Sequence, residues 1–288
     1  MKRFALCVAL LGIVTVAPAA PAPAVPPIPS MYHGARTVHL SGHAIAYFPP
    51  SVVPGTTTAP PILVVLHGSA QGPEEYISFF AKEADRRGIV LLAPSSRGAT
   101  WDAITEVVQP GLHGRPSAHD IVYRGSPDGD RIEAAIRELA RYVPVDRSKM
   151  VLAGMSDGAT FALALGMLRT HDFAAVIAFS PGIPSQAIPP AVNRRVLVSH
   201  GREDEVLSFA TTCRLILPAL RREGAEVSFR AFEGEHGISP AVASEFLDET
   251  FGPVGLPGRQ VIAGHPVKPS NAAAAEGSPC GGSKSFAE

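Results

Sequence analysis

The chain alternates between short apolar runs and longer amphipathic stretches. The apolar runs are typical of strands buried on both faces, and they lie at 62–66, 89–94, 150–153, 173–179, 195–199 and 227–232. The stretches between them have helical periodicity or many good helix formers, at 73–87, 130–142, 159–168, 209–222 and 240–251. Residues 38–48 alternate loosely and predict early antiparallel strands. This order predicts an α/β fold, with a mostly parallel central sheet and helices on both of its faces.

The beginning of the chain differs in composition from the middle. Residues 1–3 are Met-Lys-Arg, residues 4–16 are apolar, and two small-x-small sites follow, a pattern typical of a secretory signal peptide over 1–24. The apolar run is shorter than the roughly 20 residues that a membrane-spanning helix needs, so we expect no stable membrane insertion after cleavage. The protein is therefore expected to be exported, to a periplasm or to the medium.

Two further segments bound the folded part. A Pro-rich stretch at 25–34 predicts an extended linker. Residues 253–288 are rich in Gly, Pro, Ala and Ser and have little apolar periodicity, which predicts a disordered tail. The interval 35–252 remains as one catalytic domain.

Composition excludes several classes of protein. The formal net charge of the 288 residues is −1, so nucleic acid is not an expected partner. The ten histidines lack the paired spacing of metal ligands, and we expect no metal. Of the three cysteines, Cys7 lies in the predicted signal peptide, Cys213 in a helical pattern and Cys280 in the tail. A bond between the last two could form in an oxidising compartment, but two unrelated thiols are the expected state.

The most informative stretch surrounds Ser156. A buried strand at 150–153 leads into Gly154-x-Ser156-x-Gly158, and helix formers follow. Strand, sharp turn and helix are the context in which this string indicates a nucleophile elbow, although an ordinary strand-to-helix turn could give the same string. Glycines at 154 and 158 would let the neighbouring strand and helix approach a strained serine, and the helix would direct its N-terminal N–H groups at the reaction site.

An acid and a base for this serine follow later in the chain. Asp204 comes after the strand at 195–199, and His236 comes after the strand at 227–232, between Gly234 and Gly237. The carboxyl ends of parallel strands meet at one edge of the sheet, and the order serine, aspartate, histidine is that of the α/β hydrolases. The base would accept the serine proton, and the acid would fix its tautomer.

Other residues compete for these two roles. Glu203, Glu205 and Asp172 are the alternative acids, and His200 and His171 are the alternative bases. Position in the loop favours Asp204 as the acid and His236 as the base. We expect His200 to cap a strand end and His171 to lie on a surface turn.

Acyl transfer also needs donors for the developing oxyanion. The backbone N–H of Asp157, directly after the serine, is one expected donor, and that of Ser69, in the turn after His67-Gly68, is the other. His67 is expected to brace this loop. The side chain of Asp157 is expected to favour the helix N-terminus and to have no catalytic role.

The segment 97–125 is the least regular part of the domain. Its residues 97–123 could form a substrate wall or partial lid. Trp101 within it is a candidate for the substrate pocket, with a structural role beneath the loop as the alternative.

Taken together, these motifs resemble a known family. The residues that carry the resemblance are Leu66-His67-Gly68, Ala93–Gly98 with Thr100-Trp101-Asp102, Gly154–Ala159, Ile177–Gly182, Ser199–Gly201 with Asp204–Leu207, and Gly234-x-His236. The chain resembles the α/β-hydrolase superfamily in its carboxylesterase and phospholipase-type branch, close to exported polyhydroxybutyrate-depolymerase-like esterases. The resemblance implies the α/β-hydrolase fold and a serine ester hydrolase that uses no cofactor.

We therefore expect a serine carboxylester hydrolase that acts through Ser156, His236 and Asp204 and an acyl-enzyme. Its partner would be a small-molecule or polymeric ester. A polyester (hydroxyalkanoate) depolymerase, a feruloyl-type esterase and a serine peptidase are the alternatives among enzymes. A hydrolase-fold binding protein without activity is the alternative from another class.

Overall fold

The structure is a computed structural model that describes residues 36–41, 43–52, 56–102, 125–182, 193–254 and 280. The predicted signal peptide at 1–24 and linker at 25–34 lie outside the described residues. So do most of the irregular segment and most of the predicted tail.

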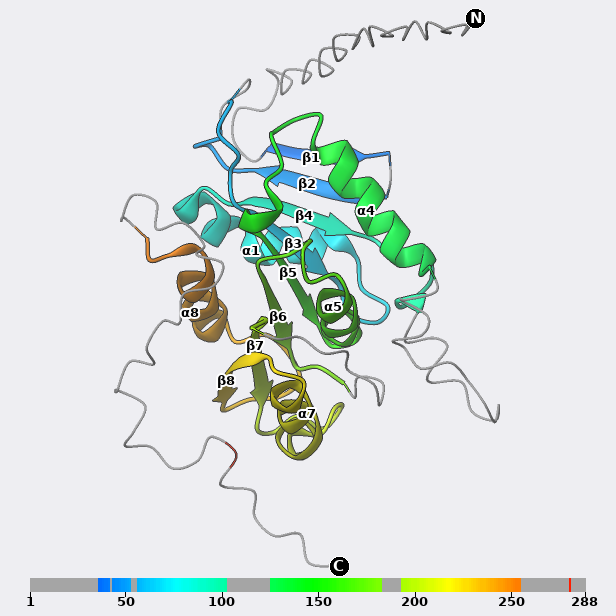
Figure 1. Cartoon of the computed structure of the whole chain (residues 1–288), viewed down its shortest axis with the longest axis vertical. Coiled ribbons are helices and arrows are strands. Elements are labelled where there is room, and N and C mark those ends of the chain that lie inside the picture. Colours follow the sequence, from blue (N-terminus) through cyan, green and yellow to red (C-terminus); the bar gives the residue numbers. More distant parts are fainter. Residues whose placement is uncertain are drawn as a thin grey trace, which may run out of the picture.

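One eight-stranded sheet forms the centre of the described part of the chain (Figure 1). Its strands are β1 (Arg36–Leu40), β2 (Ala44–Phe48), β3 (Ile62–Leu66), β4 (Val90–Pro94), β5 (Met150–Met155), β6 (Ala175–Phe179), β7 (Arg195–Gly201) and β8 (Glu226–Phe232). The spatial order is β1-β2-β4-β3-β5-β6-β7-β8. The pairs β1–β2 and β2–β4 are antiparallel and all the others are parallel, which confirms the predicted sheet.

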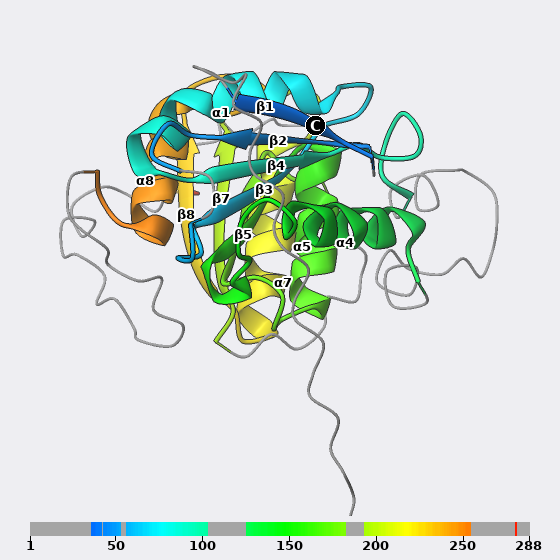
Figure 2. The same cartoon turned by 90° about the horizontal axis from the view of Figure 1, so that it is seen from above.

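Helices cover both faces of this sheet (Figure 2). They are α1 (Pro73–Arg87), α4 (Pro127–Leu139), α5 (Asp157–Leu168), α6 (Phe209–Thr211), α7 (Leu217–Arg222) and α8 (Pro240–Phe251), with a short 3₁₀ turn η1 at Arg147–Lys149. Helices α1 and α8 pack on one face, and α4, α5 and α7 pack on the other. Alternate residues of β3 enter the two cores, since Val64 packs in one and Val65 in the other.

The predicted helix at 209–222 is not continuous. Between α6 and α7 the chain forms a π-helical segment, η2 (Thr212–Ile216). Pro218 follows directly in the first turn of α7. Proline has no N–H to donate and its ring clashes with the carbonyl four residues earlier, so a wider turn before it relieves the conflict.

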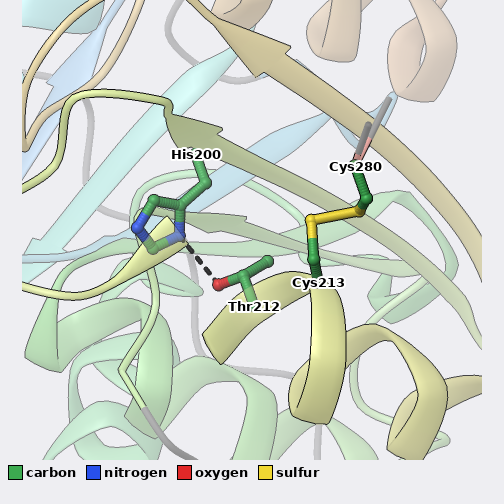
Figure 3. The surroundings of a disulfide bond; sticks show 4 residues. All are labelled: His200, Thr212, Cys213 and Cys280. Carbon is green, nitrogen blue, oxygen red and sulfur yellow. Dashed lines mark hydrogen bonds between the residues drawn. A yellow bond between two sulfur atoms is a disulfide. The ribbon is translucent and has the colours of Figure 1, made fainter. Parts of the chain in front are cut away.

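The prediction of two unrelated thiols was wrong. Cys213, in η2, forms a disulfide with Cys280 across a sequence separation of 67, with 5.8 Å between their Cα atoms (Figure 3). Both cysteines also pack against the core that contains α4 and α5. Cys280 is therefore attached to the domain, although it lies within the predicted tail.

Within the described residues, no helix is both long enough and apolar enough to cross a membrane.

Candidate active site

The three side chains predicted for catalysis lie together at the carboxyl ends of the strands. Ser156 follows β5, Asp204 follows β7 and His236 follows β8. His236 Nε2 lies 2.9 Å from Ser156 Oγ, and His236 Nδ1 lies 2.6 Å from Asp204 Oδ2. Both contacts are within hydrogen-bonding distance, and the second is short, so the imidazole bridges the hydroxyl and the carboxylate.

Ser156 occupies a sharp turn between β5 and α5. Its backbone has φ 55 and ψ −118, a strained conformation for a residue with a side chain. Its N–H donates to the carbonyl of Phe179, 2.9 Å away on β6, and this bond holds the turn against the sheet. The strained backbone places the hydroxyl above the strand ends, as in a nucleophile elbow.

The glycines on either side of Ser156 permit this turn. A Cβ on Gly154 would lie 2.2 Å from the carbonyl oxygen of Gly158, and a Cβ on Gly158 would lie 2.4 Å from that of His67. Any side chain at either position would therefore push α5 away from β3 and β5. The close approach brings the start of α5 against the loop that follows β3.

The loops after β7 and β8 are joined through their backbones. Arg202 N–H donates to the carbonyl of Phe232, and Glu203 N–H donates to that of Gly234, at 2.9 and 3.0 Å. Gly201 makes this contact possible, since a Cβ there would lie 2.3 Å from the carbonyl oxygen of Glu235. The two loops thereby carry the acid and the base toward each other.

The Asp204 carboxylate is buried and held on both of its oxygens. Oδ1 accepts the N–H groups of Val206 and Leu207 at 2.9 and 2.7 Å. Oδ2 accepts from His236. The Asp204 side chain has 0% exposure and that of His236 has 15%, so the imidazole separates the carboxylate from solvent.

The competing acids do not take the place of Asp204 beside His236. Glu203 and Glu205 flank Asp204 but are exposed. Asp172 lies 3.3 Å from Arg147 in an ion pair.

The competing bases do not contact Ser156. His171 is exposed on the turn after α5. His200 is fully buried, and its Nε2 lies 3.0 Å from Asp204 Oδ2, on the same oxygen that His236 uses. Burial lowers the pKa of His200, more strongly than the Asp204 charge raises it. His200 is therefore neutral, and its contact with Asp204 is a hydrogen bond.

The turn after β3 carries Ser69, one of the two predicted oxyanion donors. Ser69 itself is exposed. The preceding N–H, that of Gly68, donates to the hydroxyl of Tyr76 on α1 at 3.0 Å, and this hydroxyl donates to Gln71 Oε1 at 2.7 Å. Burial raises the pKa of Tyr76 to about 12, so the hydroxyl keeps its proton and fixes the turn from below.

His67 braces the same turn, as expected from the sequence. Its Nδ1 lies 2.7 Å from the carbonyl oxygen of Gly68, and its Nε2 lies 3.0 Å from the N–H of Ser96. The Ser96 N–H can only donate, so Nε2 is the acceptor and Nδ1 carries the proton. Burial lowers the pKa of His67, in agreement with a neutral imidazole.

Asp157, the second predicted donor, is the first residue of α5. An N–H in the first turn of a helix has no partner within that helix, so it is free to face a ligand. The side chain points to another partner, because Asp157 Oδ2 accepts from the hydroxyl of Thr100 at 2.7 Å.

The comparisons with known proteins fit this architecture. The Dienelactone hydrolase family matches residues 122–241, a span that includes all three bridged side chains. The structure of esterase PE8 is 22% identical, with a TM-score of 0.50 over 67% of this chain and 93% of its own. Arabidopsis thaliana SOBER1 is 20% identical, with a TM-score of 0.51 over 66% and 96%. A phospholipase/carboxylesterase from Dyadobacter fermentans DSM 18053 is 22% identical, with a TM-score of 0.50 over 73% and 95%. No curated protein matches the chain.

The chain has the α/β-hydrolase fold. The identities are low and the family match covers less than half of the chain, so the likeness is one of fold. Within this fold the serine lies at the turn after the central strand β5, where the hydrolase elbow is found.

Trp101 is packed against the turn that follows β3. The indole is fully buried, stacks on Phe161 with ring centroids 5.3 Å apart, and donates from Nε1 to the carbonyl of His67 at 2.8 Å. This placement is the structural alternative that the sequence left open. The segment predicted as a wall or lid lies outside the described residues from residue 103 onward.

Two supporting groups escaped the sequence analysis. Asp128 is buried at the start of α4 and accepts the N–H groups of Arg97 and Asp102 at 2.8 and 2.7 Å. Burial raises the pKa of Asp128. Ser180 Oγ donates to the carbonyl of Gly237 at 3.0 Å and supports the His236 loop. The string Ser126-Pro127-Asp128 is a helix-start signal that could have indicated Asp128. Ser180 lies in the Ile177–Gly182 motif, but that motif assigned it no role.

No group of three or more His, Cys, Asp or Glu side chains in the described part of the chain is arranged to hold a metal ion.

Proposed function

We propose that the protein is a serine carboxylester hydrolase that works through an acyl-enzyme. The observation that supports this most directly is the continuous hydrogen-bonded path from Ser156 Oγ through His236 to Asp204, with distances of 2.9 and 2.6 Å. The strained elbow at Ser156 and the hydrolase fold support it independently.

In the first half of the reaction, Ser156 Oγ attacks the carbonyl carbon of the ester while His236 Nε2 accepts the hydroxyl proton. The tetrahedral intermediate collapses when the bond to the alcohol oxygen breaks and His236 returns that proton to the leaving alcohol. In the second half, water attacks the acyl-enzyme with the same imidazole as base. Asp204 keeps the Nδ1–H of His236 in place and stabilises the imidazolium throughout.

The N–H groups of Ser69 and Asp157 are the proposed oxyanion donors. Support comes from the close contact between their two backbone segments, because Gly158 in the first turn of α5 packs on the carbonyls of Leu66 and His67. His67 and Tyr76 hold the turn that presents Ser69, so this donor is oriented before the substrate binds.

Export to an oxidising compartment, a periplasm or the medium, is also part of the proposal. The Cys213–Cys280 disulfide supports it, since such bonds persist in oxidising compartments and are rare in the cytosol. N-terminal sequencing of the protein recovered outside the cytoplasm tests it: a mature chain that begins near residue 25 is expected, and a full-length chain in the cytosol would contradict it.

The first experiment is hydrolysis of a p-nitrophenyl ester series from acetate to palmitate, with Ser156→Ala as the control. We expect activity in the wild type and a loss of roughly a million-fold in kcat in the variant, as for other serine triads. Full activity in Ser156→Ala would exclude the proposed nucleophile. Hydrolysis of p-nitroanilides at rates equal to the esters would favour a peptidase.

Labelling by a fluorophosphonate probe separates an enzyme from a binding protein. We expect the wild type to be labelled at Ser156 and the alanine variant to remain unlabelled. A labelled protein that hydrolyses no p-nitrophenyl ester would point to a polymeric ester substrate, and an unlabelled, folded wild type would favour a binding protein.

A further inference from the structure

Two imidazoles share one oxygen of the Asp204 carboxylate. His236 Nδ1 lies 2.6 Å from Oδ2, and His200 Nε2 lies 3.0 Å from the same atom. The usual acid–base pair of a serine hydrolase needs only the first of these contacts. The second comes from His200, near the end of β7 (Arg195–Gly201).

The surroundings of His200 determine its tautomer. Its Nε2 lies 2.8 Å from the carbonyl oxygen of Leu207 and also contacts Asp204, and both of these atoms are acceptors. Its Nδ1 lies 2.8 Å from the hydroxyl of Thr212, which can donate (Figure 3). The neutral form with the proton on Nε2 satisfies all three contacts, whereas a proton on Nδ1 would leave the Nε2 lone pair facing two oxygens.

We propose that His200 is a positioning residue for Asp204, which it holds by donating Nε2–H to both Oδ2 and the Leu207 carbonyl. The proposal rests on the proposed hydrolase function, because it assigns to His200 the orientation of the acid that serves His236.

The loop from Asp204 to Leu207 explains how one imidazole can do this. Leu207 donates its N–H to Asp204 Oδ1 at 2.7 Å and receives the His200 proton on its carbonyl. His200 therefore holds the carboxylate directly through Oδ2 and indirectly through Leu207, whose N–H donates to Oδ1. With both oxygens held, the carboxylate has little freedom to rotate away from His236.

The charges around His200 agree with a neutral donor. The titratable groups that act on it are Asp204, on its own loop, and His236, from the loop after β8. Burial is the largest influence and lowers the pKa of His200. The Asp204 charge raises it and His236 lowers it.

The π-helical segment η2 brings the third partner into place. Thr212 is its first residue and is fully buried with its hydroxyl on Nδ1 of His200. The adjacent Cys213 is held by the disulfide to Cys280. A π turn at this point fits the general observation that such turns mark functional positions.

A matched pair of variants distinguishes the contacts of Nε2 with Asp204 and Leu207 from the contact of Nδ1 with Thr212. In His200→Gln the amide nitrogen lies near the place of Nε2 and can still donate to Asp204 and Leu207. In His200→Asn the amide is too short for that contact, but its oxygen can still accept from Thr212. We expect kcat for p-nitrophenyl acetate to fall roughly ten- to a hundred-fold in His200→Asn, with KM changed less than about twofold, and to fall less than about threefold in His200→Gln.

The pH profile gives a readout that a loss of packing would not move. Without the His200 donor, Asp204 Oδ2 directs more of its charge at His236 and favours the protonated form, which cannot accept the serine proton. We expect the acid limb of kcat/KM to move to higher pH in His200→Asn and to stay in place in His200→Gln. Wild-type kcat and an unmoved acid limb in His200→Asn would overturn the proposal, as would equal losses in both variants.

Nitrogen-15 spectra of the imidazoles test the arrangement apart from activity. We expect His200 to be neutral with its proton on Nε2 from pH 7 to 8, in the wild type and in Ser156→Ala. A proton on Nδ1, or a charged ring in this range, would overturn the proposal even if the variants fail to fold. If these spectra agree and the wild type hydrolyses no ester, the proposed function fails while the placement of His200 stands.

Discussion

The same dipeptide, His-Gly, lies at the carboxyl ends of two parallel strands, and the two copies support different parts of the site. His67-Gly68 follows β3 and supports the turn that carries Ser69. His200-Gly201 ends β7 and supports the loop that carries Asp204. Both histidines are buried, and burial lowers the pKa of each.

Their protons lie on different nitrogens. His67 carries its proton on Nδ1, because a backbone N–H occupies Nε2. His200 carries its proton on Nε2, because a hydroxyl occupies Nδ1 and two acceptors face Nε2. Position at a strand end therefore does not decide what a histidine does, since the neighbouring donors and acceptors select the tautomer and with it the group that is held.

The two glycines differ as well. A Cβ on Gly68 would meet the side-chain oxygen of Gln71 at 2.4 Å, and a side chain can rotate away. A Cβ on Gly201 would meet the backbone oxygen of Glu235 at 2.3 Å, and that backbone carries the base. The turn at β3 thus tolerates change better than the turn at β7.

The disulfide supports only the His200 side, and its removal should have the largest effect. A closed loop with a sequence separation of 67 corresponds to about 4 kcal/mol in the chain-entropy account. We expect the double variant Cys213→Ser with Cys280→Ser to lose about this much free energy of unfolding, as measured by urea denaturation.

Wild-type protein unfolded in the presence of a reductant is the matched control. It should match the double variant, since both lack only the covalent link. Equal stability of the oxidised wild type and the double variant would show that the bond contributes nothing to the fold.

The glycine pair gives the next largest effect. We expect Gly201→Ala to lower the free energy of unfolding by about 2 to 3 kcal/mol, because the loop after β8 must move. Activity should fall with it, as the shift displaces His236. Gly68→Ala should cost less than about 1 kcal/mol, since the Gln71 side chain can rotate. Denaturation and ester hydrolysis on both variants test this, and a reversed order would contradict the contacts of the two glycines.

Acid pH should lower the free energy of unfolding through both His67 and His200. Because the folded-state pKa of each is lowered below its ordinary value of 6.5, the unfolded chain binds more protons as the pH falls through that value. The free energy of unfolding should therefore be highest above pH 6.5 and fall below it, by up to about 1.4 kcal/mol per pH unit for each imidazole.

Urea denaturation between pH 8 and 5.5 measures this slope. His67→Gln and His200→Gln should each make it shallower. If neither variant changes the slope, this result would contradict the claim that burial lowers the pKa of these histidines.

A further small effect is expected from the tyrosine hydroxyl that supports the turn after β3. Tyr76→Phe removes the hydroxyl that accepts from Gly68 and donates to Gln71. We expect a loss of about 1 kcal/mol in stability, and a drop in kcat smaller than the roughly 100-fold that loss of an oxyanion donor itself costs.

Tyr47→Phe is the matched control for this tyrosine. Its hydroxyl donates to Asp85 at 2.7 Å, on the antiparallel side of the sheet. A similar small loss of stability with unchanged kcat is expected there. Equal effects of the two tyrosines on kcat would argue against a role of Tyr76 in the turn.

Local patterns were enough to predict most of the fold. Strand, turn and helix around Ser156 are encoded within about twenty adjacent residues, and the apolar runs predicted the strands of the sheet. The parallel sheet then required Asp204 and His236 to meet Ser156 at one edge. The structure brings these three side chains within hydrogen-bond distance.

What the sequence did not predict depends on contacts between distant segments. The Cys213–Cys280 bond joins a helix to the predicted tail, and nothing in either local pattern points to the other. The proposed role of His200 depends on Thr212, whose hydroxyl contacts the imidazole from the π-helical segment η2. The sequence pattern at 209–222 predicted an ordinary helix and gave no sign of this segment. The burial of Trp101 likewise depends on packing against α5.

The disulfide also alters what a protease can do to this protein. The covalent ring from Cys213 to Cys280 contains β8, His236 and α8. A single cut between residues 255 and 279 would sever the chain without releasing either piece, and the fragments would separate only on a reducing gel. The proposed base would stay tethered to the sheet through β8 on one side of the cut, while the last residues would remain attached through sulfur alone.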